Sequence, residues 1–227
     1  MAFAAGGKLK KISVEGGAGK PEPLTQSKAQ QYGHSFTPDG KTLAFHERGN
    51  PQDPFHLRIV SVESDSSGLR TGKPEVFLQT PADERTPAFS PDGHWLAYAS
   101  NESGTFQVYV RAFPDKGGKW QISNSSGAYP MWSRTGHELF FETLDNQVMV
   151  ATYAVKGDSF VADKPRLWSE KKLGGVVNNV RNVDLAPDGK RIAALMPVDA
   201  PEAQQSQNHV IFLENFADEL QRKVPVK

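Results

Sequence analysis

Six polar residues of this chain lie just ahead of, or inside, apolar strand motifs. They are His34, Glu84, Arg85, Tyr129, Arg181 and Asp184. Imidazole and carboxylate groups are ligands that divalent metals accept, and a bound metal can activate water to hydrolyse an ester, lactone or phosphoester. Arginine can stabilise the negative charge that develops in such a reaction. These residue types predict a hydrolytic site if the fold brings them together.

In this interpretation His34, Glu84 and Asp184 hold a zinc, manganese or calcium ion. Either arginine stabilises the developing charge, and the tyrosine orients the substrate. The alternative is that all six are ordinary polar residues at the beginnings of strands. Both interpretations depend on the elements that position them.

The elements follow from a repeated motif. Its fullest form is Phe89-Ser90-Pro91-Asp92-Gly93, followed by an apolar strand up to Tyr98. Near copies occupy residues 36–45, 132–141 and 185–194, and the turn glycines fall at positions 40, 93, 136 and 189. The copies are therefore 53, 43 and 53 residues apart. A period near 50 residues indicates a repeat architecture.

Each copy has the composition of a β-hairpin turn. Proline presets φ, aspartate accepts hydrogen bonds from its own backbone, and glycine adopts the positive φ of a tight reversal. The strand after the turn is apolar enough to be buried on both faces. Two further strands follow in each repeat, and prolines early in the fourth suit an outer edge.

Four-stranded antiparallel sheets repeated in this way predict an all-β fold, a β-propeller of about four to five blades. A β-sandwich is the alternative, but it has no reason to repeat its turn sequence. The first strands of the blades would surround a central channel, so the six polar residues would meet at its mouth. The predicted boundaries are a partial blade at 1–27, complete blades at 28–80, 81–125 and 126–171, a partial blade at 172–216 and a helical tail at 217–227.

The strand count predicts an incomplete or open ring. The first sheet is expected to have only its third and fourth strands, and the last sheet to lack its fourth. Bare apolar faces and unpaired edges recruit other chains. We therefore expect a homodimer that covers both open ends.

The composition of the chain excludes some classes of binding partner and some kinds of chemistry. The chain has 26 basic and 26 acidic residues and no cysteine. Zero formal charge argues against nucleic acid or an anionic membrane as a partner, and thiolate chemistry is excluded. The start, Met1 to Gly7, is too short in apolar residues for a signal peptide, and no later run approaches membrane-spanning length. A soluble cytoplasmic or periplasmic protein is expected.

The repeated aromatic-Ser-Pro-Asp-Gly motif resembles the TolB-type, WD-repeat-like propeller repeat of bacteria, over nearly the whole chain. The third copy departs from it with Arg134-Thr135 in place of Pro-Asp, and the fourth with Leu185-Ala186 in place of aromatic-Ser. The tail at 209–225 is similar to the end of the propeller in bacterial serine/threonine protein kinases, although no kinase motif is present. The resemblance implies a binding or scaffolding module for a protein or small ligand, and the metal-dependent hydrolase is the alternative.

Overall fold

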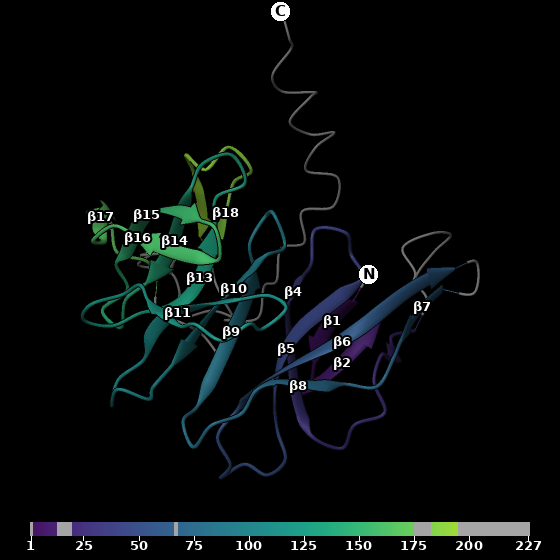
Figure 1. Ribbon diagram of the computed structural model, residues 1–227. Coiled ribbons are helices and arrows are strands. Elements are labelled where there is room, and N and C mark those ends of the chain that lie inside the picture. Colours follow the sequence, from purple (N-terminus) through teal and green to yellow (C-terminus); the bar gives the residue numbers. More distant parts are fainter. Residues whose placement is uncertain (1, 13–19, 66–67, 175–182, 195–227) are drawn as a thin grey trace, which may run out of the picture. The chain divides into compact units, whose positions relative to one another are not determined.

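The computed structural model describes residues 2–12, 20–65, 68–174 and 183–194. The chain divides into two compact units, residues 1–195 and 196–227, and every described residue lies in the first. Regular structure in the described ranges consists of β-strands (Figure 1). No helix in those ranges is long and apolar enough to cross a bilayer. Arg181, much of the predicted partial blade at 172–216 and the predicted helical tail at 217–227 lie outside the described residues.

Three sheets contain the predicted four-strand repeat, with antiparallel neighbours in chain order. One is built from β4 (Gln30–Phe36), β5 (Thr42–Arg48), β6 (His56–Asp65) and β8 (Glu75–Leu78). The next is built from β9 (Glu84–Phe89), β10 (Trp95–Ser100), β11 (Gln107–Ala112) and β12 (Trp120–Gln121). The third is built from β13 (Ala128–Trp132), β14 (Glu138–Glu142), β15 (Val148–Lys156) and β17 (Arg166–Ser169).

The N-terminal sheet has one strand more than expected. It pairs β1 (Ala2–Ala5), β2 (Lys8–Lys11) and β3 (Glu22–Pro23), whereas the sequence predicted only the last two. Gly6 and Gly7 have φ of +59° and +68°. Two positive φ values in a row form the tight turn that joins hairpin strands, so the short N-terminal segment pairs as a strand. At the other end, β18 (Val183–Leu185) pairs with β19 (Ile192–Ala194).

Two of the connections between third and fourth strands contain a further strand. These are β7 (Gly68–Thr71), which pairs with the end of β6, and β16 (Ser159–Ala162), which pairs with the end of β15. In both sheets the third strand is long, so its first half pairs with the fourth strand and its second half with the added one. The sequence interpretation did not identify these two strands, because a segment of four residues is too short for periodicity to decide between strand and loop.

The repeated turns have the predicted geometry in three of four copies. Gly40, Gly93 and Gly189 have φ of +72°, +73° and +67°. The N–H of Gly93 donates to the carbonyl of Ser90 at 3.0 Å, and the carboxylate of Asp92 accepts from the N–H of His94 at 3.0 Å. Gly136 is not in the left-handed region. The third copy lacks Pro-Asp, which accounts for this difference.

Replacing Gly93 by valine should lower the free energy of unfolding by about 2 kcal/mol, because a β-branched residue is strained at positive φ. A Cβ at this position would also lie 3.1 Å from Cδ of Pro38 in the preceding repeat. His94→Ala, one residue away on the exposed side of the turn, should change stability by less than about 0.5 kcal/mol. Urea unfolding curves measure both variants, and equal midpoints would show that the turn assignment is wrong.

The core is divided into layers between successive sheets. One layer joins the sheet of β1–β3 to that of β4–β8 through Leu9 and Phe45, and another joins the sheets of β4–β8 and β9–β12 through Leu57 and Tyr98. The largest layer joins the sheets of β9–β12 and β13–β17 around Trp95, Trp132 and Phe160, together with other buried residues. Every residue of β10 is buried, as expected for a strand covered on both faces. Face-to-face packing of this kind aligns the first strands of successive sheets.

Candidate functional site

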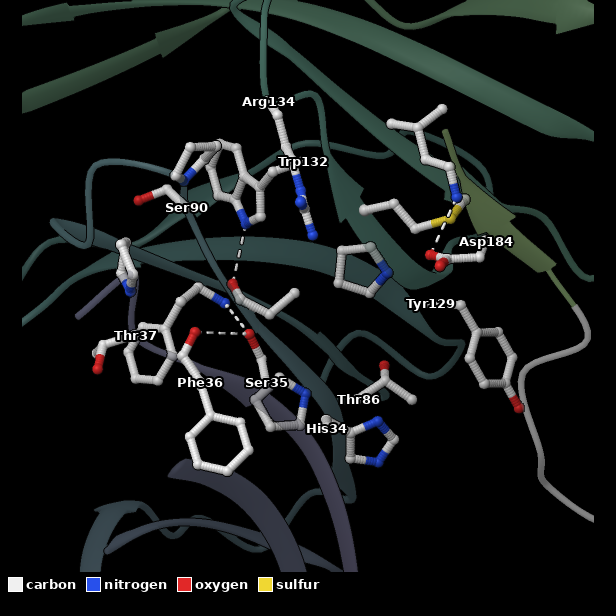
Figure 2. A pocket seen from close by; sticks show the side chains of 18 of the residues that line it. His34, Ser35, Phe36, Thr37, Thr86, Ser90, Tyr129, Trp132, Arg134 and Asp184 are labelled. Carbon is white, nitrogen blue, oxygen red and sulfur yellow. Dashed lines mark hydrogen bonds between the residues drawn. The ribbon is translucent and has the colours of Figure 1, made fainter. Parts of the chain in front are cut away.

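A pocket of about 570 Å³ is formed where the first strands of four sheets converge. Its walls come from β4, β9, β13 and β18 and from the turns that follow them (Figure 2). Aromatic rings and prolines form much of the wall, and polar side chains are interspersed among them. The polar and charged lining residues are His34, Ser35, Thr37, Thr86, Ser90, Tyr129, Arg134 and Asp184.

Bulges in three of these strands position one part of the wall. The register of β4 against β5 shifts between Gly33 and Ser35, and β9 and β13 have matching shifts at Thr86 and Tyr129. Thr86 and Tyr129 both have φ of +52°. A bulge inserts one residue and bends the strand, and it can redirect a side chain. The three shifts fall at corresponding places in the repeat, so they bring residues of different sheets to the same pocket.

His34 lines the pocket, as the sequence predicted, and its ring lies against a second histidine. The centroids of His34 and His46 are 4.6 Å apart. His46 is buried, and its Nδ1 accepts a hydrogen bond from the backbone N–H of Thr86 at 3.2 Å. Burial lowers the pKa of His46 well below its usual value, and the charges of His34, Arg85 and Arg48 lower it further. His46 therefore supports the pocket wall as a neutral acceptor.

Glu84 does not line the pocket. It is 1% exposed, its Oε2 lies 3.0 Å from Nδ1 of His56, and its Oε1 accepts a hydrogen bond from the hydroxyl of Thr80. Burial raises the pKa of this carboxyl, although the bonds to Thr80 and His56 act in the opposite direction. The hydrogen bond between Thr80 and Glu84 thus connects the loop after β8 to the start of β9.

Arg85 is also not among the residues that line the pocket. Its Nη2 lies 2.5 Å from Oδ2 of Asp83, and Nε donates to Oδ1 of the same carboxylate at 2.9 Å. The guanidinium stacks over the rings of Phe55 and Phe106, at 4.9 Å and 5.5 Å from their centroids. A paired and stacked arginine of this kind is a packing element.

Tyr129 and Asp184 both line the pocket. Burial raises the pKa of Tyr129, and the nearby carboxylate of Glu142 raises it further. The phenol therefore remains a hydrogen-bond donor at neutral pH. Asp184 is exposed, and its Oδ1 accepts the N–H of Leu185 at 3.0 Å.

The structure does not bring the three predicted metal ligands together. His34 and Asp184 share the pocket, but Glu84 is bonded elsewhere. In the described ranges no group of three or more His, Cys, Asp or Glu side chains is arranged to hold a metal ion.

Arg134 and Thr86 are among the pocket residues that the sequence interpretation missed. Arg134 extends into the pocket beside Trp132 (Figure 2). It occupies the place of Pro38 and Pro91 in the other copies, so the signal was its departure from the repeat. Thr86 lines the pocket with a buried hydroxyl that has no hydrogen-bond partner in the described structure. The only sequence feature that could have pointed to Thr86 is its position directly before Pro87.

No known protein-family profile matches the chain. Among solved structures it is similar to a candidate 6-phosphogluconolactonase from Bacteroides uniformis, at 16% identity over 86% of this chain and 62% of that one, with a TM-score of 0.54. The β-propeller domain of Cps50 (Swd1) from Myceliophteria thermophila is 15% identical over 85% and 61%, also with a TM-score of 0.54. The fold is a β-propeller.

A candidate TolB from Agrobacterium tumefaciens is also similar, at 19% identity over 70% of this chain and 57% of that protein, with a TM-score of 0.49. The chain thus spans about three-fifths of the length of these three proteins. The all-β propeller predicted from the repeated turn is confirmed, and the sheets are its blades. The likeness to kinase propellers stays a prediction.

Proposed function

We propose that this propeller is a binding module that receives a partner, a small ligand or a segment of a protein, in the pocket between its blades. The observation that carries the proposal is the convergence of four first strands on one pocket of about 570 Å³. Drug-sized ligands occupy pockets of roughly 300–1,000 Å³. The lining combines polar and charged side chains with aromatic rings and prolines, so it offers a ligand both hydrogen bonds and apolar contact.

The contacts within the pocket support binding in preference to catalysis. Ser35 Oγ accepts the N–H of Phe89 at 3.0 Å, and Ser90 Oγ lies 2.5 Å from the carboxylate of Asp92. Both serines are thus engaged in holding strands and turns, and neither hydroxyl is bonded to a histidine. A nucleophilic serine would need a base within hydrogen-bond reach.

Filling the pocket tests the proposal. Ala186 lines it from the turn after β18, and Ala186→Trp should occupy part of the space. The wild-type chain and this variant, immobilised side by side, would be exposed to extract from the source cells. A protein or metabolite retained by the wild type and lost from the variant supports the proposal. Equal retention by both would place the binding surface elsewhere.

The metal-dependent hydrolase stays a second prediction, and metal analysis tests it separately. If it is correct, purified wild type contains zinc, manganese or calcium, and His34→Ala, Glu84→Ala and Asp184→Ala each lose most of it, since the loss of one ligand weakens a three-ligand site. Unchanged metal content in all three variants would eliminate this prediction. The expected homodimer likewise awaits light scattering.

A further inference from the structure

We propose that the pocket recognises an oxyanion, a carboxylate or phosphate group, and that Arg134 is the residue that binds it. This inference rests on the proposed function of the pocket and specifies its ligand class. Arg134 is exposed and lines the pocket. No carboxylate or hydrogen-bond acceptor in the described structure pairs with its guanidinium.

The missing partner distinguishes Arg134 from comparable arginines. Arg85, Arg111, Arg166 and Arg191 each form an ion pair within 3.2 Å. The guanidinium of Arg134 instead extends along the pocket beside Trp132 (Figure 2). A planar guanidinium presents donors in a fork that matches carboxylate and phosphate oxygens. An oxyanion in the pocket would supply the partner that the described residues do not.

The sequence context gives an independent reason. In the other copies this turn position is proline, which presets the backbone of the turn. The third copy has Arg134 and Thr135 in place of that proline and the following aspartate. Its turn glycine, Gly136, is not in the left-handed conformation. Local rules are commonly broken where function requires it. Here the departure places a cation in the pocket.

The remaining polar lining is also rich in donors. Tyr129 keeps its phenolic proton because burial raises its pKa. The Thr86 hydroxyl is buried with no hydrogen-bond partner among the described residues, and a buried donor that stays unsatisfied is costly. Among the described residues that line this pocket, Asp184 is the one carboxylate, and its Oδ1 already accepts a backbone N–H. The lining therefore favours a negatively charged group attached to an apolar body.

Matched small probes test the charge requirement. The probes are 3-phenylpropionate, its uncharged amide 3-phenylpropionamide, and phenyl phosphate, with binding followed by tryptophan fluorescence, since Trp132 lines the pocket. We expect an anionic probe to bind about tenfold more tightly than the amide, because hydrogen bonds to charged groups are the stronger ones. Sodium chloride should weaken that binding. Preference between the two anions identifies carboxylate or phosphate as the natural group.

Variants assign the effect to the residue. Arg134→Gln should lose about tenfold in affinity for the anionic probe and become indifferent to charge, whereas Arg134→Lys should lose less. Arg166→Gln, an exposed arginine on β17 that pairs with Glu138, is the matched control and should bind as wild type. Equal binding of acid and amide, unchanged binding by Arg134→Gln, or no binding of any probe would overturn the inference. Suppose that acid and amide bind equally well and that Ala186→Trp weakens the binding of both. The proposed binding function of the pocket then stands, and only the requirement for a charged ligand fails.

Discussion

Replacing Phe160 by alanine should lower the free energy of unfolding by about 3–5 kcal/mol, the usual cost of deleting a buried aromatic side chain. Phe160 lies on the short strand β16 and is 2% exposed. Its ring is stacked on Tyr153 with centroids 4.9 Å apart, and it contacts Trp95 at 5.2 Å and Trp132 at 5.9 Å. It therefore fills the space between the blades of β9–β12 and β13–β17.

The neighbouring residue is a matched control. Val161 lies on the same strand and is 46% exposed, so Val161→Ala should change stability by less than about 0.5 kcal/mol. Urea unfolding followed by tryptophan fluorescence measures both variants, since Trp95 and Trp132 contact Phe160 directly. A small effect of Phe160→Ala would mean that the two blades are not joined through this cluster.

Phe160 also shows where sequence interpretation of the fold reached its limit. The repeated turn identified the hairpins because proline, aspartate and glycine each have a local physical role there. Phe160 follows the turn at Gly157, in a segment of alternating exposure four residues long. Such a segment is too short for periodicity to decide between strand and loop. Its burial depends on the adjacent blade, which no local pattern encodes.

The sequence also predicted only some of the residues that form the candidate site. Aligning the repeats placed His34, Tyr129 and Asp184 near one another, and all three line the pocket. Glu84 and Arg85 were expected beside them because they precede the same motif. The direction of a side chain depends on strand alternation and on the bulge between Arg85 and Ala88. That bulge is a property of pairing with β10, so sequence position alone did not predict which residue would face the pocket.

Acidification should destabilise this protein through His46. The ring of His46 lies among those of His34, Tyr32 and Phe55, with centroids 4.6, 5.1 and 4.6 Å away. Positive charge comes from Arg48 and Arg85, whose guanidinium groups both stack over Phe55, and from His34 when protonated. A proton on Nδ1 would also displace the hydrogen bond from the N–H of Thr86. The folded chain therefore favours neutral His46.

The sign of the pH dependence follows from the lowered pKa. The unfolded chain takes up a proton near the ordinary value of 6.5, whereas the folded chain resists it to a much lower pH. The contribution of His46 is therefore complete above pH 6.5 and is lost as pH falls toward the folded pKa. The loss is roughly 1.4 kcal/mol for each pH unit within that window.

His46→Gln isolates this contribution from other titrating groups, because its amide oxygen can accept the Thr86 N–H but cannot take up a proton. Unfolding free energies of wild type and variant, measured at intervals from pH 7.5 to 4.5, should converge as pH falls, since only the wild type loses the His46 contribution. His94 lies on an exposed turn, so the unfolding free energy of His94→Gln should change with pH in parallel with that of wild type over the whole range. Parallel curves for wild type and His46→Gln would show that His46 does not titrate differently on folding. Convergence would show that the wall between His34 and Thr86 weakens in acid, and with it the pocket that both residues line.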